Sequence, residues 1–152
     1  MRALREAVPA AVNRRVARAQ HHVDGRIEKT AGDTIVPFER FEEMLEMYAG
    51  ELARRRLDGA VWGHISDGNV HPNIIPTCFA DVESGREAML AFGRHAIALG
   101  GAPLAEHGVG RNPTKQRLLV ELYGERGIEE MRAVKRALDP EGILAPGVLF
   151  AR

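Results

Sequence analysis

The sequence has little of what marks secreted, membrane or nucleic-acid-binding proteins. It contains one cysteine, Cys78, which excludes an internal disulfide and favours a reducing, cytoplasmic compartment with the thiol buried as a small apolar group. Its 21 basic and 21 acidic residues cancel, so no overall field attracts nucleic acid or an anionic membrane surface. No segment reaches the roughly 18 apolar residues that a membrane span needs, and the first residues lack the apolar core of a signal peptide.

Near the start of the chain, basic residues gather on one face of a predicted helix. Apolar residues recur at helical spacing within residues 2–19, although Pro9 is expected to kink or delay this helix. The opposite face carries Arg14, Arg15 and Arg18, a grouping that would suit a nucleic-acid patch. Because the chain as a whole is uncharged, we interpret these arginines as a solvated helix face.

What the sequence does contain is the composition of one soluble globular domain, with 45% hydrophobic and 28% charged residues in 152 positions. Apolar spacing and helix-ending residues predict further helices at 38–57, 81–99, 113–124 and 126–138. β-forming residues predict a hairpin with one strand at 59–66 and a second from residue 70, a loop or short strand around 34–36, and a strand within 102–107. This order predicts an α+β fold, in which helices pack mainly on one face of an antiparallel sheet of about three strands.

The predicted sheet is small for a chain of this length. We therefore expect an exposed sheet edge, and with it pairing to a partner or formation of a homo-oligomer. Pro72 falls inside the second strand of the hairpin and, because proline has no N–H to donate, it predicts an edge strand or a bulge there.

The segment GHISDGNVH, residues 63–71, holds two of the six histidines of the chain. A hairpin that turns inside this segment brings His64 and His71 side by side across the two strands. Two imidazoles at that reach can share a divalent metal ion, with Glu106 of AEHG as a third ligand. Histidines that flank a turn are also common as ordinary strand residues, and spacing alone leaves both interpretations open.

Longer motifs resemble a known family. GHISDGNVHPN and AEHGVGR, followed by ALDPEGILAPGVLF, are similar to the C-terminal, substrate-cap part of FAD-linked oxidases related to vanillyl-alcohol oxidase. The likeness is to the branch of D-lactate dehydrogenase, D-2-hydroxyglutarate dehydrogenase and the glycolate oxidase flavin subunit, and DTIVPFERFEEML extends it over nearly the whole chain. The resemblance implies a ferredoxin-like cap domain, present here in part.

The resemblance also implies a set of site residues. Matched motif by motif, His64, His71 and Glu106 take the roles of ligands to a divalent metal, which zinc, manganese or iron would fit. His107 takes the role of the catalytic base near the flavin, and Asn73 that of a substrate contact. In the implied reaction the metal lowers the pKa of the hydroxyl of a 2-hydroxy acid, the base takes the proton, and hydride passes to FAD.

The chain also departs from the family. Ser66 and Ala105 stand where glycine is usual, and Ala145 stands where an asparagine usually faces the flavin. The FAD-binding domain of the family has no counterpart in these residues. We therefore expect residues 1–152 to be the C-terminal part of a cap domain, inactive alone, which needs an FAD-binding domain or subunit to oxidise a small 2-hydroxy acid. The alternative is a stand-alone metal or small-acid binding or interaction module without redox activity.

Overall fold

The computed structural model describes residues 2–150, with side chains from residue 6 onward. The helices are α1 (Arg2–His22), α2 (Phe41–Arg55), α3 (Phe79–Ala98) and α4 (Pro113–Leu138). The strands are β1 (Thr30–Ala31), β2 (Thr34–Ile35), β3 (Gly59–His64) and β4 (Asn69–Ile74), and short 3₁₀ turns, η1 (Phe38–Arg40) and η2 (Ile65–Asp67), precede α2 and β4. Across residues 2–150 no helix combines the length and the hydrophobicity of a membrane span.

The strands form one antiparallel sheet, which confirms the predicted α+β class. β4 lies in the middle, paired with β3 on one side and with β1 and β2 on the other. β3 and β4 form the predicted hairpin, in register from Gly59 opposite Ile74 to His64 opposite Asn69. β1 and β2 have two residues each, and the described part of the sheet thereby reaches four strands.

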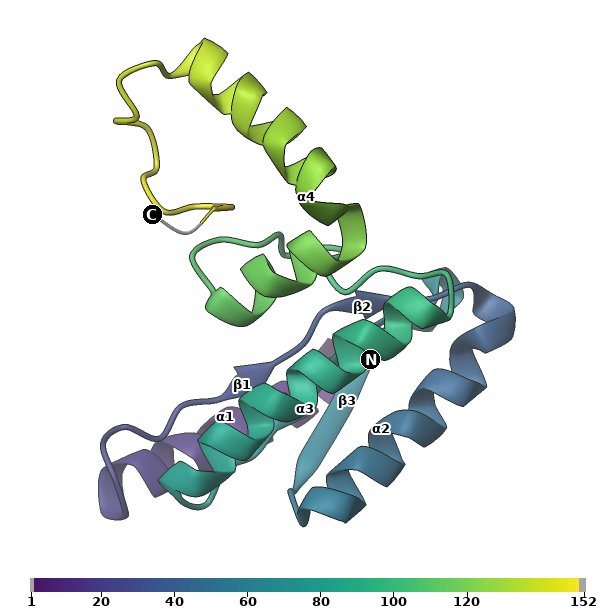
Figure 1. The fold of residues 1–152 in the computed structure, drawn as a ribbon. Helices are drawn as coiled ribbons and strands as arrows, with labels where there is room; N and C mark the ends of the chain where they lie inside the picture. The colour runs from purple at the N-terminus through teal and green to yellow at the C-terminus, as the bar shows by residue number, and fades with distance from the viewer. Residues whose placement is uncertain (1, 151–152) are drawn as a thin grey trace.

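The main core lies between the sheet and the helices α2 and α3, which run over one face of it (Figure 1). Tyr48 of α2 and Phe92 of α3 meet edge to face, with ring centroids 4.6 Å apart. Val70 and Ile74 of β4 are buried in the same cluster. Since alternate residues of a strand face opposite sides, Asn69, His71 and Asn73 of β4 lie on the other face.

α1 packs on that other side of the sheet (Figure 1). Its Val12 and Val16 are buried in a cluster with Ile75, just after β4, against which Trp62 of β3 also packs. Pro9 lies inside α1, and of the two predicted outcomes, a kink or a delayed start, the delay is excluded because the helix already begins at Arg2. The buried valines follow Pro9, and their packing supports the helix beyond the main-chain hydrogen bond that proline removes.

Pro72 lies in the central strand, although the sequence predicted an edge strand or a bulge. The pairings of β1 and β2 with β4 share one register, which sets Gly32 opposite Pro72. The N–H of Gly32 donates to the carbonyl of Pro72 at 2.8 Å. The return bond would need the N–H that proline lacks, so the ladder is interrupted there and β1 and β2 count as separate strands.

The segment 102–107, predicted as a strand, is mostly a loop. Only Ala102 pairs, through an isolated bridge to Ile35 of β2. Pro103 has no N–H with which to continue the ladder, and Gly108 takes a positive φ of 64°. The EHG motif therefore lies on a loop whose shape is not set by strand pairing.

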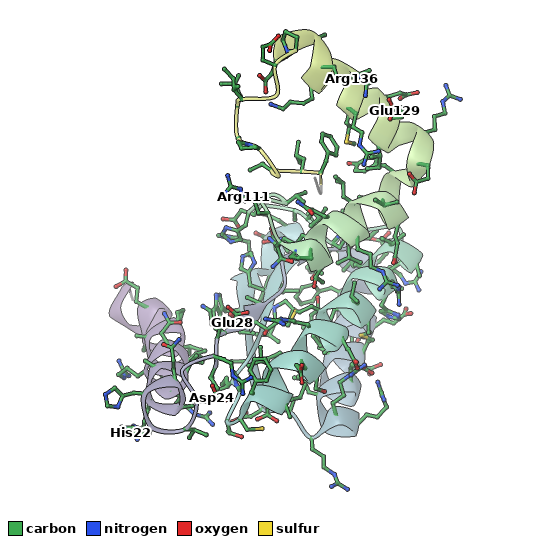
Figure 2. All side chains as sticks on the ribbon, turned by 60° about the vertical axis from the view of Figure 1, so that its left-hand side comes forward. His22, Asp24, Glu28, Arg111, Glu129 and Arg136 are labelled. Atoms are coloured by element: carbon green, nitrogen blue, oxygen red, sulfur yellow. The ribbon has the colours of Figure 1, made fainter. Side chains whose placement is uncertain are left out.

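α4 contains the two predicted helices in one element. Gly124, with φ 69° and ψ 168°, interrupts the helical geometry between them. The tail after α4 folds back, and the N–H of Leu149 donates to the carbonyl of Gly110 at 2.9 Å. Figure 2 shows the second half of α4, labelled at Glu129 and Arg136, standing apart from the sheet with the tail below it.

Two local predictions need correction. α2 ends at Arg56, whose φ of 55° is left-handed, rather than at Asp58 and Gly59. Cys78, predicted to be buried, is half-buried because it caps the start of α3, where the chain comes to the surface.

Candidate metal centre

The hairpin places His64 and His71 on one face of the sheet. His64 pairs with Asn69 and Trp62 pairs with His71. All four side chains therefore lie on the same face of the sheet, which α1 covers in part. The turn between the strands is tight: Gly68 has φ 69°, and a Cβ there would lie 2.2 Å from the carbonyl oxygen of Val36. A larger residue would displace the turn, and the two imidazoles with it.

Glu106 reaches the same place from the loop after α3. Its Oε2 lies 3.2 Å from Nε2 of His71 and 3.7 Å from Nε2 of His64. One ligand atom from each of the three residues lies within 4.8 Å of the others, although Glu106 is distant from both histidines in sequence. The structure thus brings together the three residues that the sequence proposed as ligands.

The three side chains meet at the wall of an open groove of about 350 Å³. His71 is buried, with 11% of its side chain exposed, whereas the side chains of His64 and Glu106 are 45% and 47% exposed. The groove is lined by Glu6, Pro9, Trp62, Gly63, His64, His71, Glu106 and His107. One side of the ligand set is therefore anchored in the protein and the other faces a space that a small molecule can enter.

His107, the predicted base, lines this groove beside the ligand set. Its ring centroid lies 4.9 Å from that of His71, with the ring planes tilted by 57°. Asn73, the predicted substrate contact, does not line the groove. Its side chain is 2% exposed, its Nδ2 donates to the carbonyl of His71 at 2.7 Å, and its Oδ1 has no hydrogen-bond partner in the described structure.

Asp33 is the residue of this region that sequence reasoning missed. It is 1% exposed and lies behind His71, with Oδ1 3.5 Å from Nδ1 of that histidine. Burial would raise the pKa of Asp33, but hydrogen bonds from the N–H groups of His107 and Glu106 and from Asn69 outweigh it and lower the pKa. The signal in the sequence was its place as the first residue of DTIVPFERFEEML, a segment that extended the family resemblance without giving Asp33 a role.

The donor set decides what the cluster can hold. Two imidazole nitrogens and one carboxylate oxygen suit zinc, manganese or iron, and three protein ligands leave coordination positions open. An ion ~2 Å from each ligand atom would set these atoms less than about 4 Å apart, so small side-chain rotations suffice. The residues present therefore fit a divalent metal whose open positions face the groove.

Comparison with known proteins gives a consistent result. A family model described as "FAD linked oxidases, C-terminal domain" matches residues 2–149. Glycolate oxidase subunit GlcD of Bacillus subtilis is 34% identical over 126 residues, which are 79% of this chain and 26% of that protein. A probable mitochondrial D-lactate dehydrogenase of Danio rerio is 32% identical over 117 residues, 76% of this chain and 23% of that protein.

A third relative, D-2-hydroxyglutarate dehydrogenase of Stutzerimonas stutzeri, is 38% identical over 102 residues, 60% of this chain and 20% of that protein. The chain thus spans about a quarter of the length of the curated relatives that it matches, 26% and 23% in the two cases above. Three relatives that are named for different substrates share this stretch of sequence.

Proposed function

The chain belongs to the family of C-terminal domains of FAD-linked oxidases, and from this premise we propose that it is the metal-holding cap portion of an FAD-dependent 2-hydroxy-acid dehydrogenase. The observation that carries the proposal is the convergence of His64, His71 and Glu106 within 4.8 Å at an open groove. The names of the relatives refer to glycolate, D-lactate and D-2-hydroxyglutarate, which are all 2-hydroxy acids. We propose a substrate of that class and leave the particular acid open.

Each residue has a separate task in this proposal. His64, His71 and Glu106 hold the divalent metal, which when bound supplies a Lewis acid for the hydroxyl and carboxylate oxygens of the substrate. His107 accepts the hydroxyl proton, since its ring lies beside that of His71 and lines the groove. Asn73 is proposed as a substrate contact, and the support for this role is that its Oδ1 has no hydrogen-bond partner in the described structure.

FAD enters the proposal through a partner. A dinucleotide needs a large shaped pocket, and the groove at the ligand set holds about 350 Å³. We propose that an FAD-binding domain or subunit supplies the hydride acceptor and that residues 1–152 alone do not turn over substrate. For the compartment we propose the cytoplasm, on the basis of the single Cys78.

The experiment that tests the site is metal titration of the purified chain. We expect wild-type protein to bind one equivalent of Zn²⁺ or Mn²⁺, measured by calorimetry and by elemental analysis after dialysis. The variants His64→Ala and Glu106→Ala each remove one ligand, and their affinity should fall more than about 100-fold, beyond the range for residues outside the ligand set.

His22→Ala is the matched control. His22 is also an exposed histidine, but it ends α1 about 20 Å along the helix from the groove residue Pro9 (Figure 2). Its removal should leave metal binding unchanged. If His64→Ala and Glu106→Ala bind as much metal as His22→Ala does, the site assignment is wrong.

A further inference from the structure

Asp33, between β1 and β2, lies directly opposite His71 of the neighbouring strand β4. β1 pairs Ala31 with Asn73 and β2 pairs Thr34 with Val70, and this common register sets Asp33 opposite His71. The carboxylate is 1% exposed, and a buried charge is costly unless hydrogen bonds or an opposite charge compensate it. The groups that stabilise the buried carboxylate of Asp33 therefore indicate the role of this residue.

The first set of contacts is to the loop that carries the EHG motif. Oδ2 of Asp33 accepts the main-chain N–H of Glu106 at 2.8 Å and that of His107 at 2.6 Å. These charge-assisted bonds hold two consecutive peptide groups. Because the bridge at Ala102 is the last strand pairing before this loop, Asp33 supplies fixed attachment points at the motif itself.

The second contact is to the buried ring of His71. Nδ1 of this histidine has no hydrogen-bond partner in the described structure, and Oδ1 of Asp33 lies 3.5 Å from it. Nε2 of the same ring faces Glu106 at 3.2 Å. An imidazole that gives Nε2 to a metal must carry its proton on Nδ1, and that N–H needs an acceptor.

We propose that Asp33 is the positioning residue of this site, which sets the tautomer and orientation of His71 and fixes the loop that presents Glu106 and His107. The inference rests on the proposed metal site for its purpose but on separate contacts for its geometry. Oδ1 of Asp33 accepts the Nδ1–H of His71 once the ring moves by a few tenths of an ångström, while Asn69 Nδ2, at 3.1 Å from Oδ1, holds the carboxylate in place. One buried carboxylate thus connects two of the three ligands and the base.

The first test needs no metal. Two-bond ¹H–¹⁵N correlation spectra of the imidazoles report which nitrogen carries the proton in the neutral ring. We expect His71 of a metal-free Glu106→Ala chain, in which the carboxylate 3.2 Å from Nε2 is removed, to be the Nδ1–H tautomer, and the further change Asp33→Asn to shift it toward the Nε2–H tautomer. A His71 with its proton on Nε2 in the Glu106→Ala chain would overturn the inference, and this result is available even if the Asp33→Asn chain does not fold.

The second test measures Zn²⁺ affinity by competition with a chelator. Asp33→Asn should bind Zn²⁺ about 10- to 100-fold more weakly than wild type, as expected for loss of a partner of a ligating histidine. Asp81→Asn is the control for a purely structural effect. Asp81 also accepts main-chain N–H bonds, from Thr77 at 2.8 Å and Cys78 at 3.2 Å, but it lies at the start of α3 and does not line the groove.

The outcomes separate the two proposals. Equal Zn²⁺ affinity in wild type and folded Asp33→Asn contradicts the positioning role but leaves the metal site intact. A wild-type chain that binds no Zn²⁺ or Mn²⁺ contradicts the proposed function, and the tautomer of His71 then decides the role of Asp33 by itself.

Discussion

At the residue scale, three buried or half-buried aspartates in this chain, Asp33, Asp81 and Asp139, are stabilised by main-chain N–H donors. Asp33 accepts two such bonds at the site, and Asp139 accepts those of Ile143 and Leu144 where the tail leaves α4. Asp81 does the same at the start of α3, where its effect on stability can be measured without disturbing the candidate metal site. Carboxylate charge therefore contributes to local structure in several places.

Asp81 makes stability depend on pH. Burial would raise its pKa, but hydrogen bonds from Thr77 and Cys78 outweigh it and lower the pKa. A carboxyl whose pKa is lower in the folded than in the unfolded chain stabilises the fold above the unfolded pKa, and that contribution is lost as pH falls through the folded pKa. We expect Asp81→Asn to lower the free energy of unfolding at pH 7 by about 1 kcal/mol, as for a lost helix cap.

Urea denaturation over a pH series checks this expectation. The difference between wild type and Asp81→Asn should shrink as the pH falls below about 4, the usual pKa of an unfolded aspartate. Glu46→Gln, on the exposed side of α2, is a control that should change little at any pH. If the difference in free energy of unfolding between wild type and Asp81→Asn stays constant from pH 7 down to about pH 2.5, below the pKa of an unfolded aspartate, the effect is one of packing instead.

The sequence predicted the site residues to different degrees. His64, His71, Glu106 and His107 stand in motifs, and the structure brings them together at one groove. Asp33 could not be assigned a role, because its partners are main-chain N–H groups 73 and 74 residues away and the identity of residues 106 and 107 says nothing about them. Whether the ligands hold a metal stays a prediction until the titration is done.

At the element scale, the helices could be predicted from the sequence of each segment, whereas the strands depended on contacts between segments distant in sequence. α2, α3 and both halves of α4 follow from apolar spacing within each segment. The strand predicted at 102–107 shrank to one bridge, and Pro72 took a central position. Both outcomes depend on which segment lies across the sheet, here Gly32 opposite Pro72, and no single segment encodes that.

The bend in α4 makes a testable contrast between two glycines. Gly124 has φ 69° and ψ 168°, a region that essentially only glycine adopts, whereas Gly50 lies inside α2 with ordinary helical geometry. Neither would bring a new Cβ within 4 Å of another atom. Gly124→Ala should therefore destabilise the fold by about 1–3 kcal/mol, through backbone strain alone.

Gly50→Ala is expected to have the opposite sign, because alanine loses less conformational freedom in a helix, and should stabilise by about 0.5–1 kcal/mol. Thermal and urea denaturation of the two variants beside wild type measure the contrast. Two variants that shift stability in the same direction would mean that the bend at Gly124 is not held in solution.

At the scale of the whole molecule, the sheet has an open side. Among the described residues β3 pairs only with β4, so its other edge carries unpaired main-chain groups. Val61 on this strand and Ile65 just after it are 36% and 62% exposed. An exposed edge with apolar neighbours favours pairing with a further strand, from a partner or from a second copy.

We expect the chain to self-associate as its concentration rises, and Val61→Lys to reduce this, because a charged edge residue disfavours strand pairing. Light scattering coupled to size exclusion, over a concentration series, measures the mass. Val134→Lys is the control, since Val134 is 59% exposed but lies on the second half of α4. A wild-type chain that stays monomeric throughout, or a Val134→Lys effect as large as that of Val61→Lys, would contradict edge pairing.

Asp33 holds the loop through hydrogen bonds to main-chain N–H groups rather than to the side chains of residues 106 and 107, and this affects how such a site can evolve or be redesigned. Every amino acid except proline offers the same main-chain N–H. The side chains at positions 106 and 107 can therefore change while their hydrogen bonds to Asp33 persist. Diversification of the reaction and conservation of the scaffold are thereby uncoupled. An engineer who grafts new reactive groups at these two positions would inherit their placement without having to rebuild it.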